Sequence, residues 1–199
     1  MRVMRPSVPV LIGVVAVVAT SGCGAGAPST TSTVTSGGPT ASRDVNVSAT
    51  FTKELGPAIT YDESLVPVGS RAAVSATAAA GKTTIKLALR GLQPQRQYGA
   101  HAHAKPCGAK GEDAGPHFQN VVDPVQPSVD PKYANSQNEI WLDLLTDPTG
   151  AGSAETTVAW EFPADRRAQS VVVHAMGTST EPGKAGTAGA RAACVTVAF

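Results

Sequence analysis

The sequence has few aromatic residues, few charged residues and no marked excess of positive charge. Aromatic residues make up 5% and charged residues 16% of its 199 residues. Lysine and arginine number 16 against 15 acidic residues, so there is no excess positive charge to neutralise the phosphates of a nucleic acid. Alanine, glycine, threonine and valine are plentiful instead, and small and β-branched side chains favour strands over long helices. We therefore expect no nucleic-acid partner and one strand-rich domain.

The N-terminal residues predict an export signal rather than part of the fold. Arg2 and Arg5 supply positive charge, and the apolar run over 8–20 is too short to span a bilayer comfortably. Two small residues then precede Cys23. The segment resembles the lipobox of bacterial lipoproteins, in which the cysteine is lipidated, although Thr20 stands where that motif usually has leucine. A plain secretory signal cleaved nearby is the alternative.

The composition after residue 23 predicts a tether that precedes a folded domain. Residues 24 to about 43 are mostly glycine, alanine, proline, serine and threonine, which lack the apolar content needed to fold. We expect a signal peptide over 1–22, a lipid-anchored flexible linker over 23–44 and a folded domain over 45–199. The protein is then expected on the extracytoplasmic face of a bacterial cell membrane, held there only by its lipid.

The three cysteines fit this division. If Cys23 carries lipid, Cys107 and Cys194 remain as an even pair in an oxidising compartment. A crosslink between them would close a long loop and is worth roughly 4–5 kcal/mol in the chain-entropy model.

Short alternating runs from about residue 45 onward predict an all-β fold. Ala80-Gly81 marks a hairpin, and a proline-rich loop over 104–136 and a glycine-rich loop over 177–190 separate the later runs. The pattern indicates eight or nine strands in an antiparallel β-sandwich or flattened barrel with two long loops. Strands are predicted over 45–52, 58–62, 72–79, 83–89, 97–103, 139–146, 156–162, 170–175 and 191–198.

The chain has only four histidines, and all of them lie at predicted strand ends or in the long loops. His101 and His103 are two residues apart, so they project from one face of a strand and can bind one metal. Alone this pair is also compatible with a plain surface position, and His174 alone with a structural role. Together with His117, however, the set predicts one metal site. An all-nitrogen donor set favours copper(II), whereas structural zinc more often takes cysteine.

Five segments carry a resemblance to a known family. The last is the most specific, because it matches Gly-x-Ala-Gly-x-Arg-x-Ala-Cys at every fixed position. In this order they resemble the copper–zinc superoxide dismutase family, over roughly residues 70–199. The segments are Gly99–His103, Cys107, Gly115–Phe118, Val172–His174 and Gly186–Cys194.

The resemblance implies a role for each matching residue. It makes the four histidines the copper ligands, pairs Cys107 with Cys194 in the internal disulfide, and matches Gly99 to the glycine before the His-x-His pair. Arg191 matches the arginine that attracts superoxide beside copper, and His117 matches the ligand that releases and rebinds the metal during turnover. The implied fold is an all-β, eight-stranded Greek-key β-sandwich or flattened barrel with two long loops. The implied activity is dismutation of superoxide to oxygen and hydrogen peroxide.

The sequence also departs from the family pattern. No histidine lies between His117 and His174, so the family's zinc site cannot be assembled, and we expect copper without zinc. Residues 177–180 lack the aspartate that links the family's two metal sites. The second long loop carries only Glu181 and Lys184, so we expect weak electrostatic steering and a copper ion open to solvent.

Two questions stay open at this point. By the period of a strand, Glu139, Trp141 and Asp143 share one face. Glu139 then either hydrogen-bonds a copper-ligating histidine in place of zinc or is a solvated carboxylate at the start of a strand, and the second interpretation is the favoured one. The second question is function: the alternatives to dismutation are a non-catalytic copper-binding or buffering surface lipoprotein, and a structural sandwich with incidental metal affinity. No apolar stripe identifies an oligomer interface.

Overall fold

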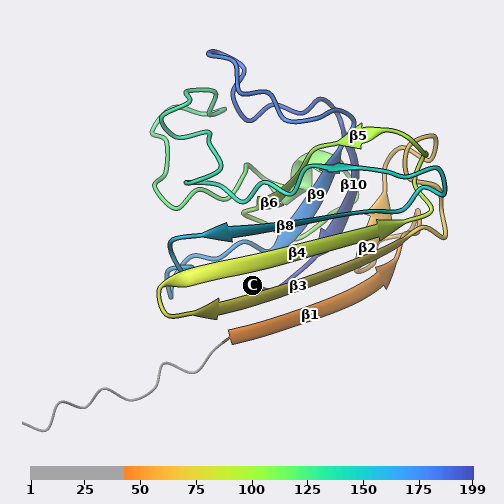
Figure 1. Cartoon of the computed structure of the whole chain (residues 1–199), viewed down its shortest axis with the longest axis horizontal. Coiled ribbons are helices and arrows are strands. Elements are labelled where there is room, and N and C mark those ends of the chain that lie inside the picture. The colour runs from red at the N-terminus through yellow and green to blue at the C-terminus, as the bar shows by residue number, and fades with distance from the viewer. Residues whose placement is uncertain (1–42) are drawn as a thin grey trace, which may run out of the picture. The chain divides into compact units, whose positions relative to one another are not determined.

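Two antiparallel sheets lie face to face in the computed structural model, which describes residues 43–199 (Figure 1). The elements are β1 (Arg43–Thr50), β2 (Ala58–Thr60), β3 (Arg71–Ala79), β4 (Lys82–Arg90), β5 (Gln97–Tyr98), β6 (Ala100–His103), η1 (Gly111–Ala114), β7 (Leu144–Leu145), β8 (Gly152–Val158), β9 (Ser170–His174) and β10 (Arg191–Thr196). One sheet has the order β1-β3-β4-β8 and the other the order β2-β10-β9-β6, while β5 pairs with β7. The predicted all-β sandwich is confirmed. Within these residues no helix has the length and apolarity to cross a membrane.

The β1-β3-β4-β8 sheet buries one face and exposes the other. Along β4, Ile85, Leu87 and Leu89 are buried, whereas Lys86 between them is exposed. This alternation follows from the period of two along a strand. Each large apolar side chain buried here contributes roughly 1.5–3 kcal/mol, so the sheet supplies one wall of the core.

A tight hairpin fixes the register of this sheet. Ala80 and Gly81 connect β3 to β4, and both have positive φ, at 52° and 75°. Two consecutive residues of this kind form the type I′ turn, whose twist matches that of the paired strands. Ala79 therefore pairs with Lys82, and the predicted hairpin is confirmed.

The β2-β10-β9-β6 sheet is buried on both faces. Every residue of β6 and of β9 is buried, including the Val171–Val173 run. Its inner face contacts the core between the sheets, and Val172 belongs to a second apolar cluster with Ala114 and Cys194 on the other side. The two long loops thus cover the outer face of this sheet and bury its side chains.

The strand β10 contains a bulge. Arg191 lies opposite His174 on β9, but Ala193 lies opposite Val173, so the pairing shifts between them. The intervening Ala192 turns its carbonyl oxygen away from β9, where it accepts the backbone N–H groups of residues 61 and 62 at 2.8 and 3.0 Å. A bulge of this kind changes which face the following side chains occupy.

Three sequence predictions of local structure were wrong. The strand predicted over 139–146 is reduced to β7 and two single-residue bridges, because residues 139–143 pair with their neighbours only at isolated positions. The strand predicted over 156–162 is β8, which begins four residues earlier at Gly152, where small residues carry little strand signal. The loop over 104–136 contains the single-turn helix η1.

Candidate metal centre

The strand β6 supplies two of the histidines. His101 and His103 project from its outer face, whereas Ala100 and Ala102 belong to the core. A Cβ added to Gly99 would lie 2.7 Å from a side-chain carbon and 2.8 Å from a backbone oxygen of the loop over 175–190. Glycine is required at this position because that loop crosses directly over the start of β6.

The other two histidines come from the long proline-rich loop and from β9. His117 forms a single bridge with His103, and His174 ends β9. One nitrogen from each of the four rings lies within 4.8 Å of the others. His101 and His103 are fully buried, whereas 18% of the His117 side chain is exposed. The structure therefore brings together all four histidines that the sequence singled out.

Backbone carbonyls fix the orientation of two of the rings. His103 Nδ1 lies 2.9 Å from the Gly115 oxygen, and His174 Nδ1 lies 3.3 Å from the Gly189 oxygen. A carbonyl oxygen only accepts, so both Nδ1 atoms donate and both Nε2 atoms carry a lone pair. These two Nε2 atoms face each other at 3.4 Å, an arrangement that a bound cation would stabilise.

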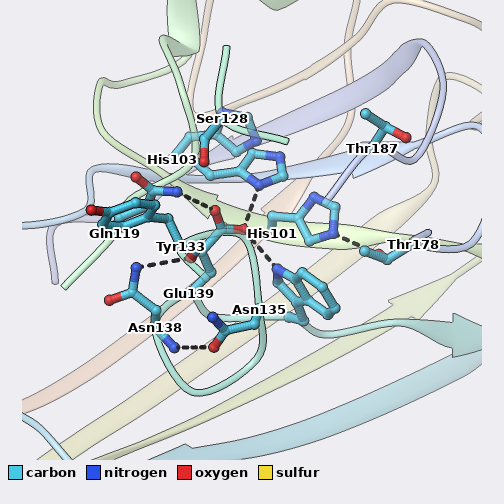
Figure 2. Close-up of polar contacts among 12 residues, drawn as sticks. His101, His103, Gln119, Ser128, Tyr133, Asn135, Asn138, Glu139, Thr178 and Thr187 are labelled. Atoms are coloured by element: carbon cyan, nitrogen blue, oxygen red, sulfur yellow. Dashed lines mark hydrogen bonds and ion pairs between the residues drawn. The ribbon is translucent and has the colours of Figure 1, made fainter. Parts of the chain in front are cut away.

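A threonine and a carboxylate lie behind His101. Its Nε2 is 2.7 Å from Thr178 Oγ1 (Figure 2). Thr178 Oγ1 in turn lies 2.6 Å from Asp143 Oδ1. Residues 177–180 hold no aspartate, as the sequence shows, but Thr178 of this segment contacts His101 through its hydroxyl. The Thr178 hydroxyl and the Asp143 carboxylate are 35 residues apart in the sequence, so no local sequence motif predicts their contact behind His101.

Glu139 lies behind His117. Its Oε2 is 2.7 Å from His117 Nδ1 and also accepts the indole N–H of Trp141 at 2.7 Å. Its Oε1 accepts an N–H of Gln119 at 2.8 Å, a contact drawn in Figure 2. The residue is only 1% exposed, so the favoured interpretation of a solvated carboxylate was wrong. With Trp and Gln as donors, the carboxylate is left to accept from His117 as well, so His117 Nε2 carries the lone pair.

Burial keeps three of the four histidines, His101, His103 and His174, neutral at physiological pH. Burial, followed by the charge of His117, lowers the pKa of His101 and His103 well below the usual value of 6.5. Burial and the charge of His117 also lower the pKa of His174 to about 3. Neutral imidazole is the form that binds a metal, so the site is held in the state that coordination requires.

Arg191 reaches the site from β10. Its guanidinium donates to the Gly111 oxygen at 2.7 Å, and within residues 43–199 it forms no ion pair. Burial lowers the pKa of Arg191, but an arginine retains its charge at neutral pH. The disulfide implied for Cys107 and Cys194 is present and fastens the segment that carries Gly111 to β10. The arginine is thus a fixed positive charge beside the histidines.

A pocket of about 250 Å³ opens onto the cluster. His117, His174 and Arg191 form part of its lining, so these groups meet solvent at its base. The polar side chains from the two loops that line it include Ser128 and Thr187, which are uncharged. The lining also holds the buried carboxylate of Glu139, and Arg191 is its one permanently positive group, toward which a small anion entering the pocket is drawn.

The donor set fits a copper ion. The inward atoms are His101 Nδ1 and the Nε2 atoms of the other three rings, since each opposite nitrogen has a partner. His101 Nδ1 is one of only two buried side-chain nitrogen or oxygen atoms in the described residues that lack a hydrogen-bond partner. A buried polar atom without a partner is costly, and a metal ion bound to the Nδ1 lone pair would account for this arrangement. Four imidazole nitrogens are donors that copper(II) prefers.

Sequence reasoning missed three supporting residues. Thr178, Asp143 and Gln119 lie far apart in the sequence, and none belongs to a motif. The shared face of residues 139, 141 and 143 was the one available signal for Asp143, because the period-two pattern holds wherever the chain is extended. Nothing comparable indicated Thr178 or Gln119, whose partners are set by tertiary structure.

Comparisons with known proteins agree with this geometry. The family model described as copper/zinc superoxide dismutase matches residues 69–197. The solved structure of the Cu/Zn superoxide dismutase from Brucella abortus superposes with a TM-score of 0.52, covering 79% of this chain and 99% of that one. At 21% identity this likeness concerns the fold. None of the curated proteins matches the chain.

Proposed function

Because the chain belongs to the copper/zinc superoxide dismutase family, we propose that it binds one copper ion at its four histidines and dismutes superoxide to oxygen and hydrogen peroxide. The single observation that carries this proposal is the convergence of four imidazoles, each with its outward nitrogen hydrogen-bonded, beside an arginine that forms no ion pair within residues 43–199. Copper, when bound, supplies a centre that accepts an electron from one superoxide and returns it to a second.

Arg191 and His117 are the residues proposed to act on the substrate. The Arg191 guanidinium attracts the superoxide anion into the pocket, an effect that weakens as salt screens the charge. His117 is the most exposed of the four rings and lines the pocket, so its Nε2 is placed to exchange a proton with solvent. Glu139 holds the Nδ1 proton of His117 throughout, so the ring returns to one orientation.

We propose that copper is the only metal bound. Glu139 occupies the Nδ1 side of His117, which a zinc ion would need, and the four histidines form the single metal-competent cluster found within residues 43–199. Metal analysis after incubation with both ions should give one copper and no zinc per chain. E139Q should weaken copper binding about 10- to 100-fold, the range typical for loss of a group that orients a ligand. Stoichiometric zinc in the wild-type protein would refute this part of the proposal.

The decisive test of activity is superoxide turnover by purified protein loaded with copper alone. We expect turnover well above that of free buffer. R191A should slow it and flatten its salt dependence, whereas R90A, which removes an exposed arginine on the other sheet, should leave both unchanged. Stoichiometric copper with turnover equal to buffer would establish the alternative function, a copper-buffering lipoprotein. Such a protein gains nothing from a cation beside its metal.

We further propose that the protein is exported and held at the membrane by lipid on Cys23. The leader and the tether lie outside the described residues, so the support comes from the sequence and from the disulfide. A disulfide between Cys107 and Cys194 persists in an oxidising compartment. C23A should move the protein from the membrane fraction to the soluble extracytoplasmic fraction. If C23A stays with the membrane, the lipid anchor is wrong.

A further inference from the structure

The two nitrogens of the His101 ring have different surroundings. The ring is fully buried, and Nδ1 has no hydrogen-bond partner among residues 43–199, whereas Nε2 lies 2.7 Å from Thr178 Oγ1. A neutral imidazole carries its one proton on either nitrogen, and the neighbouring group decides which. The identity of the atom that faces the other histidines therefore depends on the Thr178 hydroxyl.

Asp143 determines which way that hydroxyl points. Thr178 Oγ1 lies 2.6 Å from Asp143 Oδ1, and the Thr178 backbone N–H donates to Asp143 Oδ2 at 2.7 Å. A carboxylate only accepts, and a hydroxyl has one proton to give. The hydroxyl proton therefore goes to Asp143, which leaves the hydroxyl oxygen as an acceptor for His101. It follows that His101 Nε2 carries the proton and Nδ1 the lone pair.

The carboxylate cannot replace the hydroxyl by itself. His101 Nε2 and Asp143 Oδ1 are 3.8 Å apart, which is beyond hydrogen-bond distance. Thr178 closes this gap, and it belongs to the loop over 175–190 rather than to the sheet. The orientation of a buried ring thus depends on a side chain carried by a loop on the surface of the fold.

We propose that Asp143 and Thr178 form a relay that fixes His101 as the Nε2–H tautomer and keeps its Nδ1 lone pair directed at the metal. Both are positioning residues, and the role assigned to them rests on the copper site proposed above. Glu139 holds His117 directly, whereas Asp143 acts on His101 through the threonine. One extended segment, residues 139–143, thereby orients two of the four rings.

The relay can be tested without copper or activity. Long-range 1H–15N NMR spectra of the metal-free full chain distinguish the two tautomers of each histidine. We expect His101 to carry its proton on Nε2. T178V removes the hydroxyl but keeps the backbone N–H that bonds Asp143, and it should convert His101 into a mixture of tautomers. T178S keeps a hydroxyl and should restore the wild-type signal, and His103, held by a carbonyl, should not change in either variant.

Two outcomes would overturn the relay. One is a wild-type His101 protonated on Nδ1, which needs no variant to be folded. The other is a His101 tautomer in T178V that is the same as in the wild type.

Copper binding separates this proposal from the proposed function. By competition with a chelator, T178V should bind copper about 10-fold more weakly than wild type, with T178S close to wild type. The electron paramagnetic resonance spectrum of bound copper(II) should change in T178V and be restored in T178S. Wild-type protein that binds no copper would refute the proposed function while the metal-free spectra still decide the tautomer. Equal copper affinity and spectra in wild type and T178V would refute the relay alone.

Discussion

The two sheets of the sandwich contribute unequally to the site. The β1-β3-β4-β8 sheet exposes one face and carries none of the histidines. The β2-β10-β9-β6 sheet is covered on both faces and carries three of them, together with Arg191 and Cys194. The difference lies less in the strands than in what covers them. The long loops bring His117 and Thr178, and the extended segment 139–143 brings Glu139, to the second sheet alone. The four histidines therefore converge at the sheet whose two faces are both buried.

The largest expected effect on stability comes from cutting the disulfide that joins the long loop over 104–136 to β10 of the second sheet. C107S removes the disulfide between residues 87 positions apart, and it should lower the free energy of unfolding by roughly 4–5 kcal/mol. Cys107 is chosen because it is partly exposed, whereas Cys194 is fully buried and would bury a hydroxyl. Urea denaturation of metal-free protein under non-reducing conditions measures the change. A loss below about 1 kcal/mol would mean that the cover is held mainly by other contacts.

A cavity in the first sheet should affect stability without affecting the site. Leu87 is 1% exposed, and L87A should cost about 3 kcal/mol of unfolding free energy, within the range for buried leucines. Copper affinity, measured well below the unfolding transition, should stay at the wild-type value. A parallel fall in copper affinity would show that the two sheets are coupled more tightly than their separate contacts indicate.

Acid should destabilise the metal-free protein through the second sheet. The unfolded chain takes up a proton at His174 as the pH falls below 6.5, but the folded protein does not until the pH nears 3. Folding is therefore opposed increasingly in between, by about 2 kcal/mol for this histidine between pH 6.5 and pH 5. His101 and His103 act in the same direction. Urea midpoints recorded across this range measure the slope.

Two variants test the source of this acid sensitivity. H174N should reduce the slope of unfolding free energy against pH, because one buried neutral histidine is removed. L87A should keep the wild-type slope, because the first sheet has no histidine. An unchanged slope in H174N would assign the acid sensitivity to other groups.

The smallest effect is expected from an ion pair on the exposed face of the first sheet. Lys86 Nζ lies 2.8 Å from Glu155 Oε2, with both side chains more than half exposed. K86A should change the unfolding free energy by less than about 1 kcal/mol and leave copper affinity unchanged. Both Glu155 and Glu139 pair with a basic side chain, but Glu139 is buried against His117 and Glu155 is exposed. The expected small effect of K86A therefore rests on the exposure of its pair. A loss above 2 kcal/mol in K86A would contradict it.

The same contrast explains what the sequence could predict. In the first sheet, β3, β4 and their hairpin were predicted closely because apolar and polar residues alternate in Thr83–Leu89 and Ala80-Gly81 marks the turn. The start of β8 was not, because its small residues carry little strand signal. The four histidines, three on the second sheet and one in the loop over it, were identified by scarcity and motif, and the structure places them together. Their supports were harder to predict, because Glu139 and Thr178 take their meaning from partners 22 and 77 residues away. Hydrogen bonds across that separation leave no periodicity in a sequence.

The bulge in β10 has a consequence for how this strand can vary. Arg191 and Cys194 are three positions apart, so a regular strand would direct them to opposite sides. The extra residue at Ala192 resets the phase, so the arginine meets η1 and the cysteine meets Cys107 on the same side of the sheet. Substitutions at Ala192 leave this phase intact, but deletion of the residue inverts it. The motif is thus defined by the number of its residues as well as by their identity.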